Sequence, residues 1–179
     1  MAQGPTTEEH VFHIVQGNFR ISDRDCDTFM TILGSCVATC LCDPVAKVGG
    51  MNHFLLPEGP QSGGDLLRYG LHAMELLINA LLKAGAQKQR LQAKLFGGAA
   101  MHDGLRDIGR SNAEFARRFL ATEGIPCIAE SLGGTQGRRL RYWPTSGRAQ
   151  LRLMDSYERV PAERPAPFNK PASDDLTLF

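Results

Sequence analysis

The sequence has little excess charge, no long apolar run and no paired-cysteine motif, and each absence narrows what the chain can be. Its 20 basic and 19 acidic residues leave a formal net charge of +1, which excludes the strong field typical of nucleic-acid or anionic-membrane binding. Charged and polar side chains interrupt the longest apolar helix candidate, which argues against membrane insertion. Residues 1–10 are polar and lack the apolar core of a secretory leader. We therefore expect a cytoplasmic protein.

The cysteines argue against both a disulfide framework and a metal site. There are five, an odd number, and none forms a C-x-x-C pair, which argues against a disulfide framework. Cys36, Cys40 and Cys42 would share one face of a strand, but ligands two residues apart on a strand rarely complete a tetrahedron. We expect no metal site, and interpret Cys40, Cys42 and Cys127 as small buried apolar residues.

The overall composition is typical of one globular domain. Hydrophobic residues make up 42% of the 179 positions and charged residues 22%, and this length can bury a substantial core. We expect a flexible start over residues 1–10, a single domain over 11–159 and a tail over 160–179. The tail is predicted because its prolines stand among charged and small residues.

Apolar patterning predicts a mixed α/β domain. Helices are expected over 65–83 and from Ser111 or Asn112 to Gly124, with Ser111 and Glu114 forming a capping box. Strands outnumber helices, and hairpins outnumber crossovers, which favours layered mixed sheets over a doubly wound parallel sheet. The strands are predicted at 11–15, 27–33, 91–96, 127–132, 140–143 and 149–154, together with two runs around residue 44.

Those two runs, 33–43 and 48–57, form the most informative feature of the chain. A type I turn from Asp43 to Ala46 would pair these two residues and place Cys36 opposite His53 in antiparallel register. Directly opposed residues share a sheet face with Cβ atoms about 5 Å apart. A register shift of one residue would separate the two side chains.

A thiol beside an imidazole has the minimum chemistry of a cysteine nucleophile. A free thiol, with a pKa near 8.5, is mostly protonated at neutral pH, and a neighbouring histidine can remove its proton. The oxyanion that follows attack on a carbonyl needs N–H donors, which Gly34 and Ser35 would supply. The Gly97-Gly98 loop could add another donor or simply allow close packing. The alternatives are that Cys36 only packs in the core and that His53 is a satisfied core histidine.

Several separate motifs, in order over residues 11–154, resemble the CheD family, the chemoreceptor glutamine deamidases of bacterial and archaeal chemotaxis. They are LGSCVA at 33–38, DP at 43–44, GGMNHFLLP at 49–57, YG at 69–70, AKLFGGAAM at 93–101, IGRSN at 108–112, and GG at 133–134 followed by Arg138. Of these, Asn112 is interpreted as a helix cap and Arg138 as a loop brace rather than as substrate contacts.

The resemblance implies a fold, a reaction and a set of residues. The fold is an α/β/β sandwich distantly similar to the deamidase domain of cytotoxic necrotizing factors. The reaction converts glutamine side chains of methyl-accepting chemotaxis receptors to glutamate, without a cofactor. Its nucleophile falls on Cys36 and its base on His53. The family's third residue is a threonine usually six places before the cysteine; Met30 stands there, and Thr31 one place later is assigned the role.

The resemblance also implies partners, and it leaves other functions open. Family members bind chemotaxis receptors and a CheC-type phosphatase. One alternative is an interaction module that binds these partners with weak or no catalysis, which the displaced threonine and the long tail would favour. Another is a cysteine hydrolase that acts on small amides rather than on folded receptors.

Overall fold

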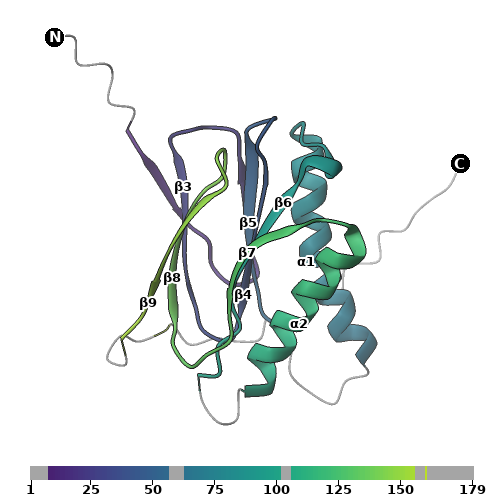
Figure 1. The fold of residues 1–179 in the computed structure, drawn as a ribbon, viewed down its shortest axis with the longest axis vertical. Helices are drawn as coiled ribbons and strands as arrows, with labels where there is room; N and C mark the ends of the chain where they lie inside the picture. Colours follow the sequence, from purple (N-terminus) through teal and green to yellow (C-terminus); the bar gives the residue numbers. More distant parts are fainter. Residues whose placement is uncertain (1–7, 57–62, 102–105, 156–159, 161–179) are drawn as a thin grey trace, which may run out of the picture.

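The structure, a computed structural model, describes residues 8–56, 63–101, 106–155 and 160. Two α-helices, a five-stranded sheet and a four-stranded sheet form three layers in this part of the chain (Figure 1). The helices are α1 (Gly63–Lys83) and α2 (Arg106–Glu123), with a short 3-10 helix η1 (Lys88–Arg90) between them. The strands are β1 (His10–His13), β2 (Phe19–Ser22), β3 (Asp27–Leu33), β4 (Val37–Asp43), β5 (Val48–Phe54), β6 (Gln92–Gly97), β7 (Cys127–Leu132), β8 (Arg138–Trp143) and β9 (Arg148–Leu153). The predicted layered α/β class is confirmed.

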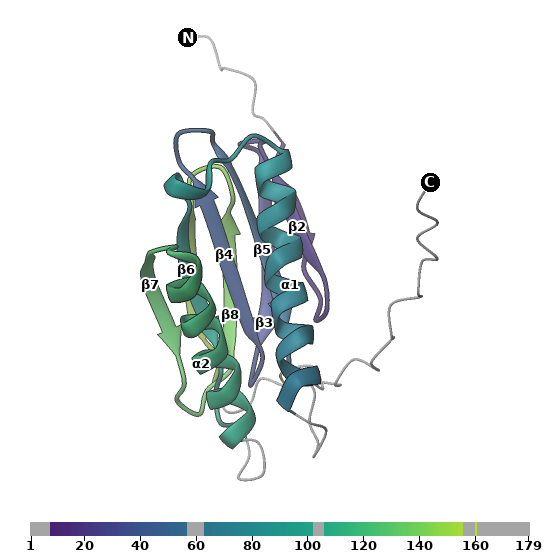
Figure 2. The same ribbon diagram turned by 90° about the vertical axis from the view of Figure 1, so that its right-hand side faces the viewer.

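The five-stranded sheet is the middle layer. Its order is β2-β5-β4-β6-β7, and the other sheet has the order β1-β3-β8-β9. Most neighbouring strands are antiparallel, while β1 with β3 and β6 with β7 are parallel, so both sheets are mixed as expected. The two helices cover one face of the five-stranded sheet, α1 over β5 and β2 and α2 over β4, β6 and β7 (Figure 2). The four-stranded sheet covers the other face.

Because both of its faces are covered, the centre of the middle sheet has no solvent-exposed side. Every residue of β4 and β5 is buried. Along β4, Val37 and Leu41 belong to the core beneath the helices, whereas Ala38 and Cys40 belong to the core between the sheets. Strands covered on two faces are typically continuous apolar runs rather than alternating ones, which is why these two runs were recognisable in the sequence.

Two glycines let the outer layers approach β5 closely. A Cβ on Gly49 would lie 2.1 Å from the carbonyl oxygen of Pro144, in the turn between β8 and β9. A Cβ on Gly50 would lie 2.7 Å from Leu77 of α1, on the opposite side. Side chains at these two positions would push the layers apart.

The register predicted for the hairpin was wrong by two residues. Asp43 pairs with Val48 rather than with Ala46. The turn is longer than predicted because Lys47 adopts a left-handed conformation, with φ of 52°, before β5 begins. His53 is therefore opposite Ala38 rather than Cys36. A shift of two residues preserves the face of the sheet, so His53 still faces the same side as the thiol.

Other boundaries also differ from the predictions. The strand β2 was missed because it is short and gains its strand character from pairing with β5. The helix α2 begins at Arg106, so the proposed capping box at Ser111 was wrong. Gly109 lies inside the helix, where a Cβ would be 2.5 Å from the Ala99 carbonyl oxygen.

The two expected ends of the chain are only partly described. His10, inside the predicted flexible start, opens β1, and the predicted tail lies outside the described residues except for Val160. Neither described α-helix contains an apolar stretch long enough to span a bilayer.

A buried carboxylate anchors the β4–β5 turn. Asp43 is fully buried, and it accepts hydrogen bonds from the backbone N–H groups of Val45 and Ala46 in the turn and of Gln87 beyond α1. The Arg90 guanidinium lies 2.8 Å from the same carboxylate. Burial by itself raises the pKa of Asp43, but Arg90 and the backbone donors outweigh it and hold this pKa well below its usual range.

We predict that Asp43→Asn lowers the free energy of unfolding by roughly 3 kcal/mol, because it removes one partner of a buried ion pair. Glu130→Gln is the matched control, since the Arg117–Glu130 pair is exposed and should be worth less than about 1 kcal/mol.

The effect should also depend on pH. The pKa of Asp43 is lower in the folded state, so its contribution to stability is present above the unfolded pKa, about 3.9, and is lost as the pH falls through the folded pKa. In urea unfolding, the cost of Asp43→Asn should therefore shrink below about pH 4. A cost equal to that of the control at pH 7 would contradict this role.

Candidate active site

The connection between β3 and β4 carries the chain from one sheet to the other and contains Cys36. It is only three residues long, Gly34 to Cys36. Each of its carbonyl oxygens is held from the far side of the loop. The oxygens of residues 34, 35 and 36 accept hydrogen bonds of 2.8, 3.0 and 2.8 Å from Ala99 N, Asn112 Nδ2 and Gly98 N, respectively. The backbone that presents the thiol is thereby fixed to the β6 loop and to α2.

The structure brings Cys36, His53 and Thr31 together between the two sheets. His53 Nε2, from β5, lies 2.8 Å from Cys36 Sγ. On the other side of the ring, Nδ1 lies 2.9 Å from Thr31 Oγ1, which belongs to β3 in the opposite sheet. Cys36 is 1% exposed and His53 6%, so the pair is shielded from bulk water. Shielding strengthens the electrostatic coupling between a thiol and an imidazole.

A backbone carbonyl decides which ring nitrogen carries the proton. The Ile14 oxygen lies 3.2 Å from His53 Nδ1 and also accepts a hydrogen bond of 2.7 Å from the Thr31 hydroxyl. Because a carbonyl can only accept, Nδ1 must be the protonated nitrogen, and it donates toward Ile14 O and Thr31 Oγ1. This hydrogen-bond network assigns the tautomer in which the Nε2 lone pair faces the Cys36 thiol.

Thr31 occupies the position that Met30 cannot fill. Side chains on a strand alternate between its two faces. Phe29 and Leu33 point into the core between the sheets, and Thr31 shares their face. Met30 lies on the other face of β3, away from His53, so the residue one place later in the sequence is the one that reaches the ring.

Gly97 and Gly98 support the backbone of Cys36. The Gly98 N–H already donates to the Cys36 carbonyl, which fits the expected alternative of close packing rather than that of an oxyanion donor. Gly97 has a φ of 115°, and a Cβ there would lie 2.1 Å from the Cys36 oxygen. These two residues are glycines because the loop packs directly on them. The donor role expected for Gly34 and Ser35 stays a prediction.

The other cysteines have different surroundings. Burial raises the pKa of Cys42 to about 11 and also raises the pKa of Cys40, so both remain neutral thiols at physiological pH. Their interpretation as buried apolar residues is confirmed. It was wrong for Cys127, which is exposed on the edge strand β7.

Two supporting groups were missed or misinterpreted in the sequence. The Ile14 carbonyl leaves no signal there, because it is a backbone group. Asn112 belongs to the IGRSN motif, but it lies inside α2 rather than capping it. This fully buried side chain accepts a hydrogen bond of 2.8 Å from Leu56 N and donates to Ser35 O. It therefore ties the segment after β5 to the Cys36 loop.

Arg138 has the bracing contacts expected of it. Its guanidinium donates to the Gly133 and Gln136 carbonyls and to the Ser131 hydroxyl. These contacts hold the connection between β7 and β8. That connection also touches the small-residue loop after β6, because the Ala100 N–H donates to the Gly134 oxygen.

Comparisons with known proteins place this site in a family. The family model described as "CheD chemotactic sensory transduction" matches residues 55–153. A Cereibacter sphaeroides protein named "Probable chemoreceptor glutamine deamidase CheD" is 53% identical over 169 residues, which span 94% of this chain and 85% of that protein. A protein of the same name from Caulobacter sp. (strain K31) is 51% identical over 173 residues, with 93% and 92% of the two chains covered.

Solved structures are less similar. The Neisseria meningitidis protein NMB0706, titled as family-model DUF152, aligns with 70% of this chain and 64% of its own at 12% identity and a TM-score of 0.47. Its likeness carries no argument about function. The identity to the Cereibacter and Caulobacter proteins, over nearly the whole sequence, is decisive: the chain belongs to the CheD family.

Proposed function

We propose that this chain is a chemoreceptor glutamine deamidase, which hydrolyses glutamine side-chain amides of methyl-accepting chemotaxis receptors to glutamate. Relatives that bear this name and align with more than nine-tenths of the chain support the substrate class. The observation that carries the chemistry is the 2.8 Å contact between Cys36 Sγ and His53 Nε2. A base within hydrogen-bond reach of a thiol is the basic requirement of a cysteine hydrolase.

The reaction follows from the assigned tautomer. His53 Nε2 takes the proton of Cys36, and the thiolate attacks the Cδ carbon of the glutamine amide. The imidazolium then returns its proton to the amide nitrogen as the C–N bond breaks, which releases ammonia and leaves a thioester. His53 next removes a proton from water, hydroxide attacks the thioester, and the thiol leaves with that proton. The net change is glutamine plus water to glutamate plus ammonia.

Thr31 and Ile14 act through His53 rather than on the substrate. Their oxygens hold the Nδ1–H, so the ring keeps its plane and its tautomer while Nε2 loses and gains a proton. Orientation of this kind is a substantial part of catalysis by histidine bases. The thiol is deeply covered, and this favours a slender, extended substrate group such as a glutamine side chain over a bulky one.

The family resemblance supports two further proposals. We infer that the protein works in the cytoplasm and that a CheC-type phosphatase binds it. Pulldown of each partner with wild-type protein and with Cys36→Ala separates binding from catalysis. Retained binding with lost receptor signalling would favour the enzyme over a pure interaction module.

We predict that Cys36→Ala lowers the rate of ammonia release from receptor glutamines by about 10³-fold or more, as expected for loss of a nucleophile. Cys40→Ala is the matched control, because Cys40 lies in the same core but contacts no base among the described hydrogen bonds. It should keep most of the activity below its melting temperature. The measurement is ammonia release coupled to mass spectrometry of receptor peptides. Wild-type activity in Cys36→Ala would refute the assigned nucleophile.

We predict that Thr31→Val lowers kcat about tenfold, which corresponds to the loss of one hydrogen bond worth about 1.4 kcal/mol. KM should change little, since Thr31 touches the base and not the substrate. Thr31→Ser should restore most of kcat, because it restores the hydroxyl. Met30→Ala, on the opposite face of β3, should leave kcat unchanged. Equal rates for the valine and serine variants would show that the hydroxyl does not position His53.

A further inference from the structure

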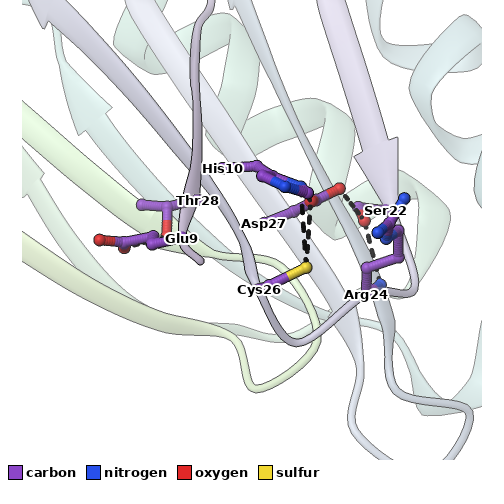
Figure 3. Close-up of polar contacts among 7 residues, drawn as sticks. All are labelled: Glu9, His10, Ser22, Arg24, Cys26, Asp27 and Thr28. Carbon is purple, nitrogen blue, oxygen red and sulfur yellow. Dashed lines mark hydrogen bonds and ion pairs between the residues drawn. The ribbon is translucent and has the colours of Figure 1, made fainter. Parts of the chain in front are cut away.

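A second group of reactive side chains lies where β1 begins beside the start of β3. His10 is the first residue of β1, and Cys26 and Asp27 stand at the entry to β3. Figure 3 shows the His10 ring, the Cys26 sulfur and the Asp27 carboxylate directed toward one another. Asp27 is four residues from Thr31 along β3, which is about 13 Å at 3.3 Å per residue. The group is therefore separate from the Cys36 site.

Three ligand atoms of this group form a closed triangle. His10 Nδ1 lies 3.2 Å from Asp27 Oδ1, and Cys26 Sγ lies 3.8 Å from His10 Nδ1 and 3.7 Å from Asp27 Oδ1. Tetrahedral zinc, with bonds of about 2.3 Å to sulfur and about 2.0 Å to nitrogen and oxygen, requires edges of about 3.3 Å for N–O, 3.6 Å for N–S and 3.5 Å for O–S. Each observed distance is within a few tenths of an ångström of these edges. We propose that His10, Cys26 and Asp27 bind a Zn²⁺ ion.

The surroundings hold the carboxylate in the orientation that a metal needs. The Ser22 hydroxyl donates a hydrogen bond of 2.7 Å to Asp27 Oδ2 and itself accepts one of 3.0 Å from the Arg24 N–H. This leaves Oδ1 directed at His10 and Cys26. Such outer hydrogen bonds to ligating carboxylates are a regular feature of protein metal sites.

Charge and access also suit the ion. Zinc binding releases the Cys26 proton to solvent, so the thiolate and the Asp27 carboxylate together balance the two positive charges. Nδ1 of His10 binds the metal as a neutral imidazole with its proton on Nε2. His10 is exposed and Cys26 half-buried, so water can complete the tetrahedron. Glu9 is not the fourth ligand, because its carboxylate is engaged with Thr28 and Arg141.

Hydrogen bonds hold the triangle together when no ion is bound. A carboxylate only accepts, so His10 Nδ1–H and the Cys26 thiol both donate toward Asp27 Oδ1. Zn²⁺ would take the place of these two protons, with the imidazole proton moving to Nε2 and the thiol proton leaving to solvent.

The test uses tag-free, full-length protein that carries Cys36→Ala, so that the Cys36–His53 pair cannot supply a thiolate. Co²⁺ titration should give one ion per chain, with a thiolate-to-cobalt charge-transfer band and the visible bands of tetrahedral Co²⁺, and Zn²⁺ should displace it. Cys26→Ser and His10→Ala should each remove the tight site. Ser22→Ala should weaken Zn²⁺ affinity 10- to 100-fold by releasing the carboxylate. Cys127→Ser, at an exposed cysteine on β7, is the matched control and should change nothing.

Thermal unfolding with and without Zn²⁺ gives an independent readout. A ligand that binds only the folded state raises the melting temperature, so Zn²⁺ should stabilise the Cys36→Ala protein but not its Cys26→Ser derivative. Absence of the charge-transfer band, or a band that survives Cys26→Ser and disappears in Cys127→Ser, would overturn the proposal. So would Zn²⁺ affinity that is equal in the Cys26→Ser, His10→Ala and control proteins.

Discussion

The chain must cross from one sheet to the other within three residues, and the candidate site depends on that crossing. Leu33 ends a strand of the outer sheet and Val37 begins a strand of the middle sheet, so the residues between them lie at the edge of the core that both sheets share. A short crossing needs small residues and fixed carbonyls, and Gly34-Ser35-Cys36 with its three donors provides them. Thr31 before the crossing and His53 on the neighbouring strand then face the same gap from opposite sheets.

Within the part of the chain that the structure describes, hydrogen bonds with two neutral oxygens orient His53. Both described partners of His53 Nδ1, the Thr31 hydroxyl and the Ile14 carbonyl, are neutral. They define the tautomer as firmly as an aspartate would, because a carbonyl cannot donate. They add no formal charge beside an imidazole that is only 6% exposed, where an unbalanced carboxylate would be costly to bury. The charge separation during the reaction is then confined to the thiolate and the imidazolium.

The features that could be predicted are those that leave a pattern of side chains in the sequence. The apolar runs of β4 and β5 can be recognised in the sequence because the middle sheet is covered on two faces. The shared face of Cys36 and His53 was correct although the register was not, because an error of two residues keeps the side-chain face that an error of one would exchange. Sequence spacing pointed to Met30 or Thr31, and only strand alternation in the structure separates them.

The parts that could not be predicted depend on backbone groups or on long-range packing. The Ile14 carbonyl has no side-chain signature. The start of α2 at Arg106 rather than at Ser111 was also not predicted. Gly109 lies inside this helix, and its close contact with the Ala99 carbonyl is set by the packing of α2 on the loop after β6. The His10–Cys26–Asp27 triangle was invisible because the parallel pairing of β1 with β3 brings together residues 16 and 17 positions apart.

The strand β1 lies beside both candidate sites. It is a short edge strand with mostly exposed side chains. Phe12 packs against Phe29 and Ile14 lies in the core between the sheets, and polar contacts add to the forces that set its register. Its parallel pairing sets His10 beside Asp27 and continues to the hydrogen bond from Ile14 N to the Met30 oxygen. A register shift of one residue between β1 and β3 would therefore separate His10 from Asp27 and also move the Ile14 carbonyl away from His53. An ion bound at His10 would stabilise the same register that orients the histidine base.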